Sequence, residues 1–165
     1  MAELLTLRDT TVIPAMSDAS IAKVRHLTDL SLRHLPQIPF VTEHRLHAGI
    51  YTRTVTIPAP PFGGKATVCT GVLVKIPTQL IISGDVIVYM GEGEAPAHVN
   101  GQRVFLGSPG RKQAFLGNGE YTMTMCFATD AKTVAEAEAQ FTDEVDLLCP
   151  LSETERHDII VGEVS

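Results

Sequence analysis

Alternating apolar and polar positions run through the middle of the chain and predict a series of short β-strands. Residues Ile50 to Pro58 alternate without interruption, so that Tyr51, Arg53 and Val55 share one side of an extended segment. Other alternating or wholly apolar runs are bounded by glycine, proline or asparagine turns and predict further strands at 67–76, 80–82, 86–89, 97–99, 103–106, 112–116 and 121–128. Short strands at this even spacing close most easily into a jelly-roll barrel.

Two turns inside this region predict hairpins. Ser83-Gly84-Asp85 joins two apolar runs, which is the pattern of a hairpin or a tight corner. Asn100-Gly101 predicts a hairpin more strongly, because a type I′ turn needs positive φ at both of its central positions. We therefore expect a reversal of the chain at Asn100-Gly101, and a reversal or a sharp corner at Ser83-Gly84-Asp85.

Helical periodicity is confined to the two ends of the chain. Ser17 can cap a helix over 18–35, and Pro36 ends it. Near the C-terminus one apolar stripe predicts a helix over about 131–148 that packs on the outer face of the barrel. The members of this stripe are Val134, Ala137, Phe141, Val145 and Leu148.

The length of 165 residues and the hydrophobic share of 44% suffice for one core, so we expect one globular domain. Its expected parts are an N-terminal arm and helix, a β-barrel, a C-terminal helix and a tail, over 1–37, 38–130, 131–149 and 150–165. Residues 1–16 alternate weakly, as an arm or an edge strand does, and the tail is expected to become ordered on contact with a neighbour.

Charge, cysteine content and hydropathy exclude several classes of partner. The net charge is −6 and the 13 Lys and Arg residues are scattered, which disfavours nucleic acid because its phosphates need clustered basic side chains. Three cysteines without paired spacing disfavour a disulfide framework, so a reducing cytoplasm is expected. No apolar run approaches a membrane span and no signal peptide is recognisable, so we expect no membrane partner and no export by that route.

Three stretches of the chain resemble one known group of proteins. They are 47–53 followed by Ile57-Pro58-Ala59, then 71–75, then Ser108-Pro109-Gly110-Arg111-Lys112-Gln113, after which Thr129-Asp130 leads into the acidic helix. In this order and spacing they resemble the small cupin-like proteins of tailed phages and prophages, over roughly residues 38–148. The resemblance implies a mainly β fold, a single cupin-like jelly-roll barrel with an N-terminal helix and a C-terminal helix.

The resemblance also identifies where a metal would be bound, and these positions hold other residues. Metal-binding cupins resembling this chain place histidines after the glycine that Gly71 matches, and after the Pro-Gly turn or on the last strand. Here the corresponding neighbourhoods hold Val74, Lys75, Thr78, Gln79, Gln113 and Cys126. Valine has no donor atom and lysine is protonated at neutral pH. We therefore expect no conventional metal site and no cofactor. His44 and His47 remain weak candidates as metal ligands, because in an extended segment their side chains would point to opposite sides.

A polar pocket without metal is one alternative. Tyr51, Arg53, Gln79 and Gln113, with Cys126 as a further member, could line a site for a small anionic or sugar-like ligand. The other alternative is that these polar groups satisfy one another in a barrel filled by valine, isoleucine and methionine. Cys126, on an alternating strand, would then be a small buried hydrophobe.

Two functions are consistent with the sequence. The first is a non-catalytic phage-encoded protein, virion-associated or an assembly accessory, present in the host cytoplasm or the virion. It would act through contacts with itself, as a homo-oligomer, and with other phage or virion proteins. The second is a metal-independent small-molecule binding protein or enzyme that uses the barrel interior. A cavity of roughly 300 Å³ or more with convergent polar groups favours the second, and a filled barrel favours the first.

Overall fold

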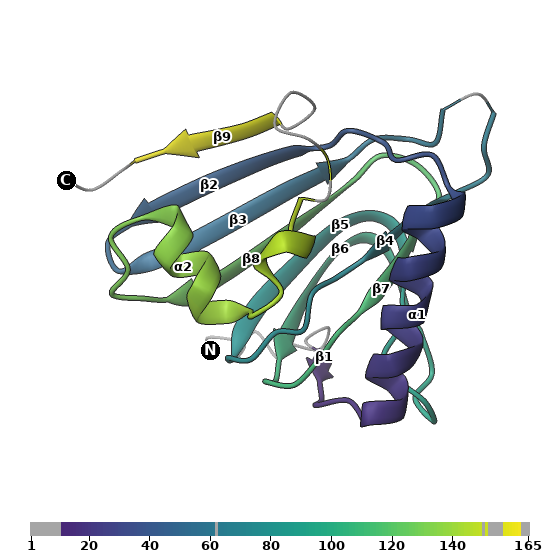
Figure 1. Ribbon diagram of the computed structural model, residues 1–165, viewed down its shortest axis with the longest axis horizontal. Helices are drawn as coiled ribbons and strands as arrows, with labels where there is room; N and C mark the ends of the chain where they lie inside the picture. The colour runs from purple at the N-terminus through teal and green to yellow at the C-terminus, as the bar shows by residue number, and fades with distance from the viewer. Residues whose placement is uncertain (1–10, 62, 150, 152–156, 163–165) are drawn as a thin grey trace, which may run out of the picture.

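A single curved sheet forms most of the protein, with one helix along its side and another across its concave face (Figure 1). The computed structural model describes residues 11–61, 63–149, 151 and 157–162. The strands are β1 (Thr11–Ile13), β2 (Val41–His47), β3 (Ile50–Ile57), β4 (Thr67–Thr70), β5 (Thr78–Val88), β6 (Ala97–Gly107), β7 (Ala114–Gly117), β8 (Tyr121–Ala128) and β9 (His157–Val161). They pair in the order β1-β6-β5-β8-β3-β2-β9, and β7 pairs with both β4 and β5 off this path. The predicted mainly β fold is confirmed.

The strand predicted at Ile50–Pro58 is β3, and it pairs antiparallel with β8 over its whole length. Arg53 lies opposite Met125 in this register, and both side chains belong to the concave side of the sheet. The strand predicted at 67–76 is shorter than expected. β4 ends at Thr70, and the Gly71 N–H that follows still donates to the carbonyl of Gln113, at 2.8 Å.

β5 and β6 run without a break through the two glycine-containing segments that were expected to turn. β6 contains Asn100-Gly101, so the hairpin predicted there is wrong, and Gly84 of β5 lies opposite Gly101 in the ladder. Both glycines have positive φ, and a Cβ on Gly84 would lie 2.5 Å from the Cβ of Tyr121. The glycines therefore bend a long two-stranded ribbon and do not reverse it. The reversal takes place at the turn between the strands, where the Glu94 N–H donates to the carbonyl of Gly91.

The helix predicted after Ser17 is α1 (Asp18–His34), which stands beside β4 and β7 in Figure 1. Ser17 caps it, because its hydroxyl accepts a hydrogen bond from the Ser20 N–H at 3.2 Å. Ser20, Ile21 and Val24 form its buried face. The Ser20 hydroxyl also accepts a hydrogen bond from the Glu92 N–H at 2.8 Å, so the helix is tied to the turn between β5 and β6.

The C-terminal helix is shorter than predicted and lies on the other face of the sheet. α2 spans Val134–Phe141, and a short 3-10 helix, η1 (Val145–Leu147), follows. The helix stops where its last carbonyl, that of Phe141, accepts a hydrogen bond from the Lys75 N–H at 2.9 Å. Ala137 and Phe141 of α2 pack against residues on the concave side of the sheet, which are Leu46, Tyr51, Val72, Val74 and Phe127. The predicted position of this helix on the outer face is therefore wrong.

Both described ends of the chain are paired into the sheet. β1 is an edge strand, parallel to β6, and its Ile13 is fully buried in the core. β9 runs parallel to β2 at the other edge, so this part of the expected tail is ordered by its own chain. Residues 1–10, 150 and 152–156 lie outside the described residues. Neither described helix combines the length and the apolar character that a membrane crossing requires.

Candidate functional site

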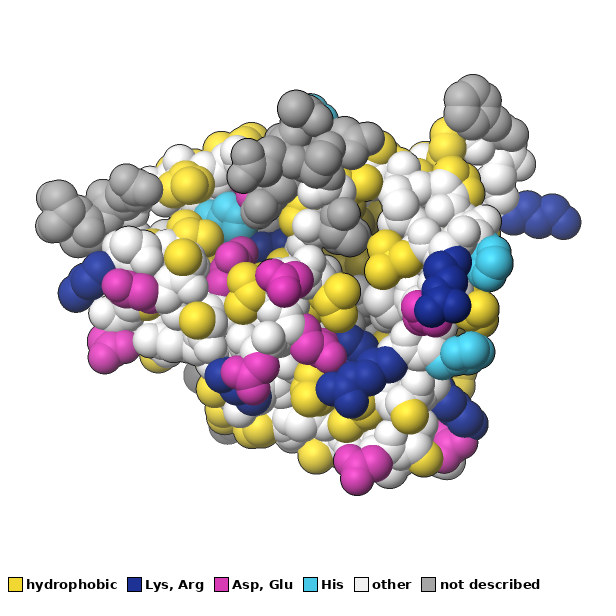
Figure 2. All heavy atoms as spheres, in the orientation of Figure 1, with side chains coloured by type: hydrophobic (Ala, Val, Ile, Leu, Met, Phe, Trp, Pro, Cys, Tyr) yellow, Lys and Arg dark blue, Asp and Glu magenta, His cyan; other side chains and the backbone are white. Residues whose placement is uncertain are grey.

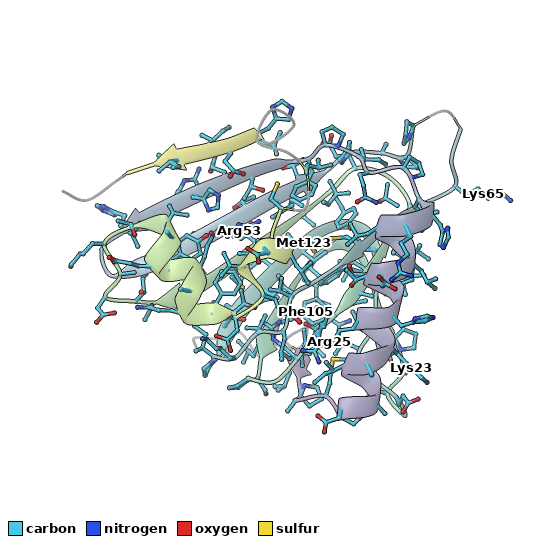
Figure 3. All side chains as sticks on the ribbon, in the orientation of Figure 1. Lys23, Arg25, Arg53, Lys65, Phe105 and Met123 are labelled. Atoms are coloured by element: carbon cyan, nitrogen blue, oxygen red, sulfur yellow. The ribbon has the colours of Figure 1, made fainter. Side chains whose placement is uncertain are left out.

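A cavity of about 550 Å³ lies on the concave side of the sheet. Its walls are formed by α1 and the linker after it, by β3, β4 and the loop between them, and by residues near the C-terminal end, together with one residue each of β5 and β7 and two of β8. Most lining side chains are apolar, including Leu32, Val55, Leu80, Phe115, Met123, Met125, Phe141 and Leu148. Two arginines, Arg53 and Arg111, also line it, and its described lining contains no carboxylate and no histidine. Figure 3 shows Arg53 of β3 and Met123 of β8 in the region between the two helices.

Arg111 is buried in this lining without a carboxylate partner. It is only 3% exposed. Its Nη1 donates to the amide oxygen of Gln113 at 2.9 Å, and its Nη2 donates to the hydroxyl of Thr78. Its Nε has no acceptor among the described residues, and no described carboxylate forms an ion pair with it. Burial lowers the pKa of Arg111 to about 10, so the side chain is still a cation at neutral pH.

The backbone around Arg111 holds the side chain in place. The Val74 N–H donates to the carbonyl of Arg111 at 2.9 Å, and the Gly110 N–H donates to the carbonyl of Val74 at 2.7 Å. The guanidinium lies directly against Gly107, where a Cβ would overlap its Nε, Cζ and Nη2. Glycine at position 107 therefore provides the space that the guanidinium occupies.

Arg53 is neutralised by the protein itself. Its Nη1 donates to Oε1 of Glu138 at 2.8 Å, and its Nη2 donates to the carbonyl of Leu148 at 3.1 Å. Both side chains of the ion pair are almost fully buried. The pair connects β3 to α2 and to the segment that follows it, so we assign Arg53 a structural role at the wall of the cavity.

Glu144 joins the segments that surround the cavity. It accepts hydrogen bonds from Lys112 Nζ at 2.7 Å, from the Leu73 N–H at 2.7 Å and from the Arg25 guanidinium at 3.2 Å. Burial would raise the pKa of Glu144, but these hydrogen bonds and the charge of Lys112 outweigh it and hold the pKa below its usual range. Figure 2 shows basic and acidic side chains adjoining on this face, between α1 and the C-terminal segment.

Two of the five predicted pocket residues, Arg53 and Gln113, line the cavity. Tyr51 is fully buried in the core cluster under α2, and its hydroxyl lies 2.8 Å from Nδ1 of His44. Burial raises the pKa of Tyr51 to about 12. Tyr51 therefore supports the wall next to Arg53 and is not itself part of the lining.

The remaining candidates lie away from the cavity. Gln79 and Cys126 lie opposite each other in the pairing of β5 with β8. Their neighbours along these strands, Leu80 and Met125, face the concave side, so Gln79 and Cys126 face the other side of the sheet. They do not line the cavity. His44 is buried and His47 is exposed, on opposite faces of β2. Within the described part of the chain, no three His, Cys, Asp or Glu side chains are close enough together to hold a metal ion.

Arg111 was not among the residues predicted to line the pocket. The available signal was its position two residues before Gln113, because side chains at this spacing share one side of an extended segment. The sequence does not show which buried arginine has a carboxylate partner. Glu138, which neutralises Arg53, is 85 residues away from it in the chain.

No family model and no curated protein sequence matches the chain. Several solved structures are similar to part of it. A cupin superfamily protein from Desulfitobacterium hafniense DCB-2 is 10% identical, with a TM-score of 0.39, over 52% of this chain and 72% of that one. The DMSP lyase DddQ from Ruegeria pomeroyi DSS-3 is 14% identical, with a TM-score of 0.41, over 58% of this chain and 50% of that one. The cupin domain of Schizosaccharomyces pombe Cnp3 is 17% identical, with a TM-score of 0.39, over 61% of this chain and 72% of that one.

These structural similarities are distant and carry no information on activity or ligand. They also do not bear on the phage or prophage origin that the sequence motifs imply. The chain has a mainly β fold with an N-terminal helix and a C-terminal helix.

Proposed function

We propose that this protein binds a small molecule in the cavity on the concave side of its sheet. The observation that carries the proposal is a cavity of about 550 Å³ in which Arg111 is buried without a counter-ion among the described residues. The volume is within the range of about 300–1,000 Å³ that is typical of ligand pockets. Apolar walls with a few convergent polar groups are also typical of such pockets. Of the two functions consistent with the sequence, these features favour ligand binding.

The side chains in the cavity suit binding better than catalysis. Burial raises the pKa of the Cys69 thiol to about 11, although the charge of Arg53 acts in the opposite direction. The thiol is therefore protonated at neutral pH and is a poor nucleophile. The described lining has no histidine or carboxylate that could move a proton. We propose a binding protein, and not an enzyme, on this basis.

A side chain that fills the cavity tests the proposal. Val55→Trp places an indole on the concave face of β3, whereas Thr56→Trp places the same group on the opposite face of the same strand. We expect the neutral fluorescent probe N-phenylnaphthylamine to bind the wild type and Thr56→Trp equally. Val55→Trp should bind it about tenfold more weakly or not at all.

Circular dichroism and the unfolding midpoint establish that each variant is folded. If Val55→Trp does not fold, Met125→Trp fills the same cavity from β8. The proposal is contradicted if the wild type binds no apolar probe, or if folded cavity-filling variants bind as the wild type does.

Self-association is the second candidate function, and the exposed sheet edge at β9 favours it. β1 and β9 end the sheet in the described residues, and an edge strand offers backbone groups for pairing with another chain. Ile159, Ile160 and Val161 of β9 are 43–53% exposed. We propose that this edge contacts a second copy or, as the motif resemblance implies, a phage or virion protein.

Size-exclusion chromatography with light scattering tests this second candidate. We expect the wild type to form a dimer or larger species, and Ile160→Lys to form a monomer, because a charge on an edge strand opposes pairing. A wild type that is monomeric at all concentrations, and that does not associate with particles, rules out this role.

A further inference from the structure

We infer that the ligand of the cavity is a carboxylate with an apolar chain, and that its carboxylate pairs with the guanidinium of Arg111. The inference rests on the proposed function and adds the chemical class of the ligand to it. In this arrangement the carboxylate lies at Arg111 and the apolar chain lies against the remaining, mostly aliphatic and aromatic lining.

The uncompensated positive charge of Arg111 favours an anionic ligand in the cavity. Arg53 is compensated by Glu138, whereas the described partners of Arg111 are the neutral side chains of Gln113 and Thr78. A buried cation without a counter-ion is unfavourable, and an anion that enters the cavity offsets this cost. The chain as a whole has a net charge of −6. The positive lining is therefore a local property of the cavity and not a consequence of overall composition.

The single uncompensated guanidinium matches one negative charge. A phosphate monoester carries about −1.5 to −2 charges at neutral pH, and its second charge would find no further uncompensated cation in the described lining. An unpaired charge is costly in an apolar cavity. A carboxylate has one charge, and its two oxygens fit the planar fork of a guanidinium. Arg111 has N–H groups to offer, since Nη1 and Nη2 each carry two N–H groups and each has one described acceptor.

The rest of the lining selects an apolar chain over a sugar. Sugar hydroxyls need polar partners once they leave water. The lining offers some, including the hydroxyls of Ser31 and Thr67, which have no described partner, but its walls are mostly aliphatic, aromatic and methionine side chains. Met123 and Met125 add flexible side chains that adapt to the shape of a chain. This weighs against the sugar-like ligand that the sequence left open.

Three probes of the same length and different charge test the inference: decanoate, decanol and decylammonium. Each is titrated against the wild type, Arg111→Met and Arg45→Met, with displacement of N-phenylnaphthylamine as the signal. Arg45 is an exposed arginine on β2 and serves as the matched control. We expect the wild type and Arg45→Met to prefer decanoate over decanol about tenfold or more, and to bind decylammonium most weakly. Arg111→Met should lose this preference and keep its affinity for decanol.

Gly107→Ala provides an independent variant that keeps the charge. A Cβ at this position overlaps the present place of the guanidinium, whose flexible side chain must then move. We expect a weaker preference for decanoate with decanol binding unchanged. This variant also decides the question if Arg111→Met does not fold.

The outcomes separate the two proposals. If decanol and decanoate bind the wild type equally, and neither Arg111→Met nor Gly107→Ala changes their ratio, the carboxylate inference is overturned while small-molecule binding stands. Decyl phosphate is titrated as a fourth probe, and if it binds more tightly than decanoate, a monoanion is the wrong class of ligand. If none of the probes binds, the proposed function itself fails.

Discussion

The two arginines of the cavity differ in what neutralises them. Arg53 is paired with Glu138 at 2.8 Å, whereas Arg111 contacts the neutral groups of Gln113 and Thr78. Both are buried, with exposures of 7% and 3%. A buried charge with its counter-ion in the same chain supports the fold, whereas one without it lowers stability until a ligand supplies the opposite charge. Burial and residue type alone therefore do not distinguish a structural arginine from a binding one.

The largest effect is expected when the Arg53 pair is broken. Glu138→Gln leaves the Arg53 guanidinium buried without a full counter-charge, and we expect the free energy of unfolding to fall by about 3 kcal/mol. Urea denaturation measures this, with Glu120→Gln, at an exposed position just before β8, as the control that should change by less than about 0.5 kcal/mol. A loss below about 1 kcal/mol for Glu138→Gln would show that the pair is not structural.

A smaller effect is expected at Glu144, whose carboxylate pairs with the residue directly after Arg111. Glu144→Gln weakens the contacts with Lys112, the Leu73 N–H and Arg25, and we expect a loss of about 2 kcal/mol at neutral pH.

This loss should depend on pH. The pKa of Glu144 is lowered in the folded protein, so the carboxylate adds stability above its unfolded pKa of about 4.3 and loses this contribution as the pH falls through the folded pKa. The difference between the wild type and Glu144→Gln should therefore be full at pH 7 and shrink in acid. A difference that is constant down to pH 3 argues against this assignment.

The smallest effect is expected at Arg111. Arg111→Met removes hydrogen bonds to Gln113 and Thr78 but also removes a buried cation whose pKa burial has lowered to about 10. We expect these contributions to offset each other, and the free energy of unfolding to change by no more than about 1 kcal/mol in either direction. A loss of 3 kcal/mol or more in the same urea denaturation would place Arg111 with Arg53 as a structural residue.

Local sequence patterns were sufficient for the elements whose signals come from neighbouring residues. The alternation at Ile50–Pro58 predicts β3, and Ser17 with Pro36 brackets α1. Glycines at positions 84 and 101 were misleading, because positive φ suits a turn and a bend equally. Tyr121 favours the bend, because it packs against Gly84 from β8, which is far from Gly84 in the sequence but next to β5 in the sheet.

The site was only partly predictable, because contacts between segments far apart in the sequence decide which residues line it. Arg53 was found because alternation puts it on the same side of its strand as Val55, and Gln113 because the family resemblance puts it where a metal ligand would lie. Gln79 and Cys126 were placed on the wrong side of the sheet, since a shift of one residue in a strand exchanges its faces. The absence of a described counter-ion at Arg111 depends on the whole surrounding fold, and no local pattern encodes it.

The contact between Gly107 and Arg111 has an evolutionary consequence. A side chain at position 107 would displace the guanidinium, because the three atoms nearest to a Cβ there all belong to Arg111. The two positions are therefore expected to change together. Among homologues that keep the ligand, both residues should be retained, and lineages that have abandoned it should show substitutions at both.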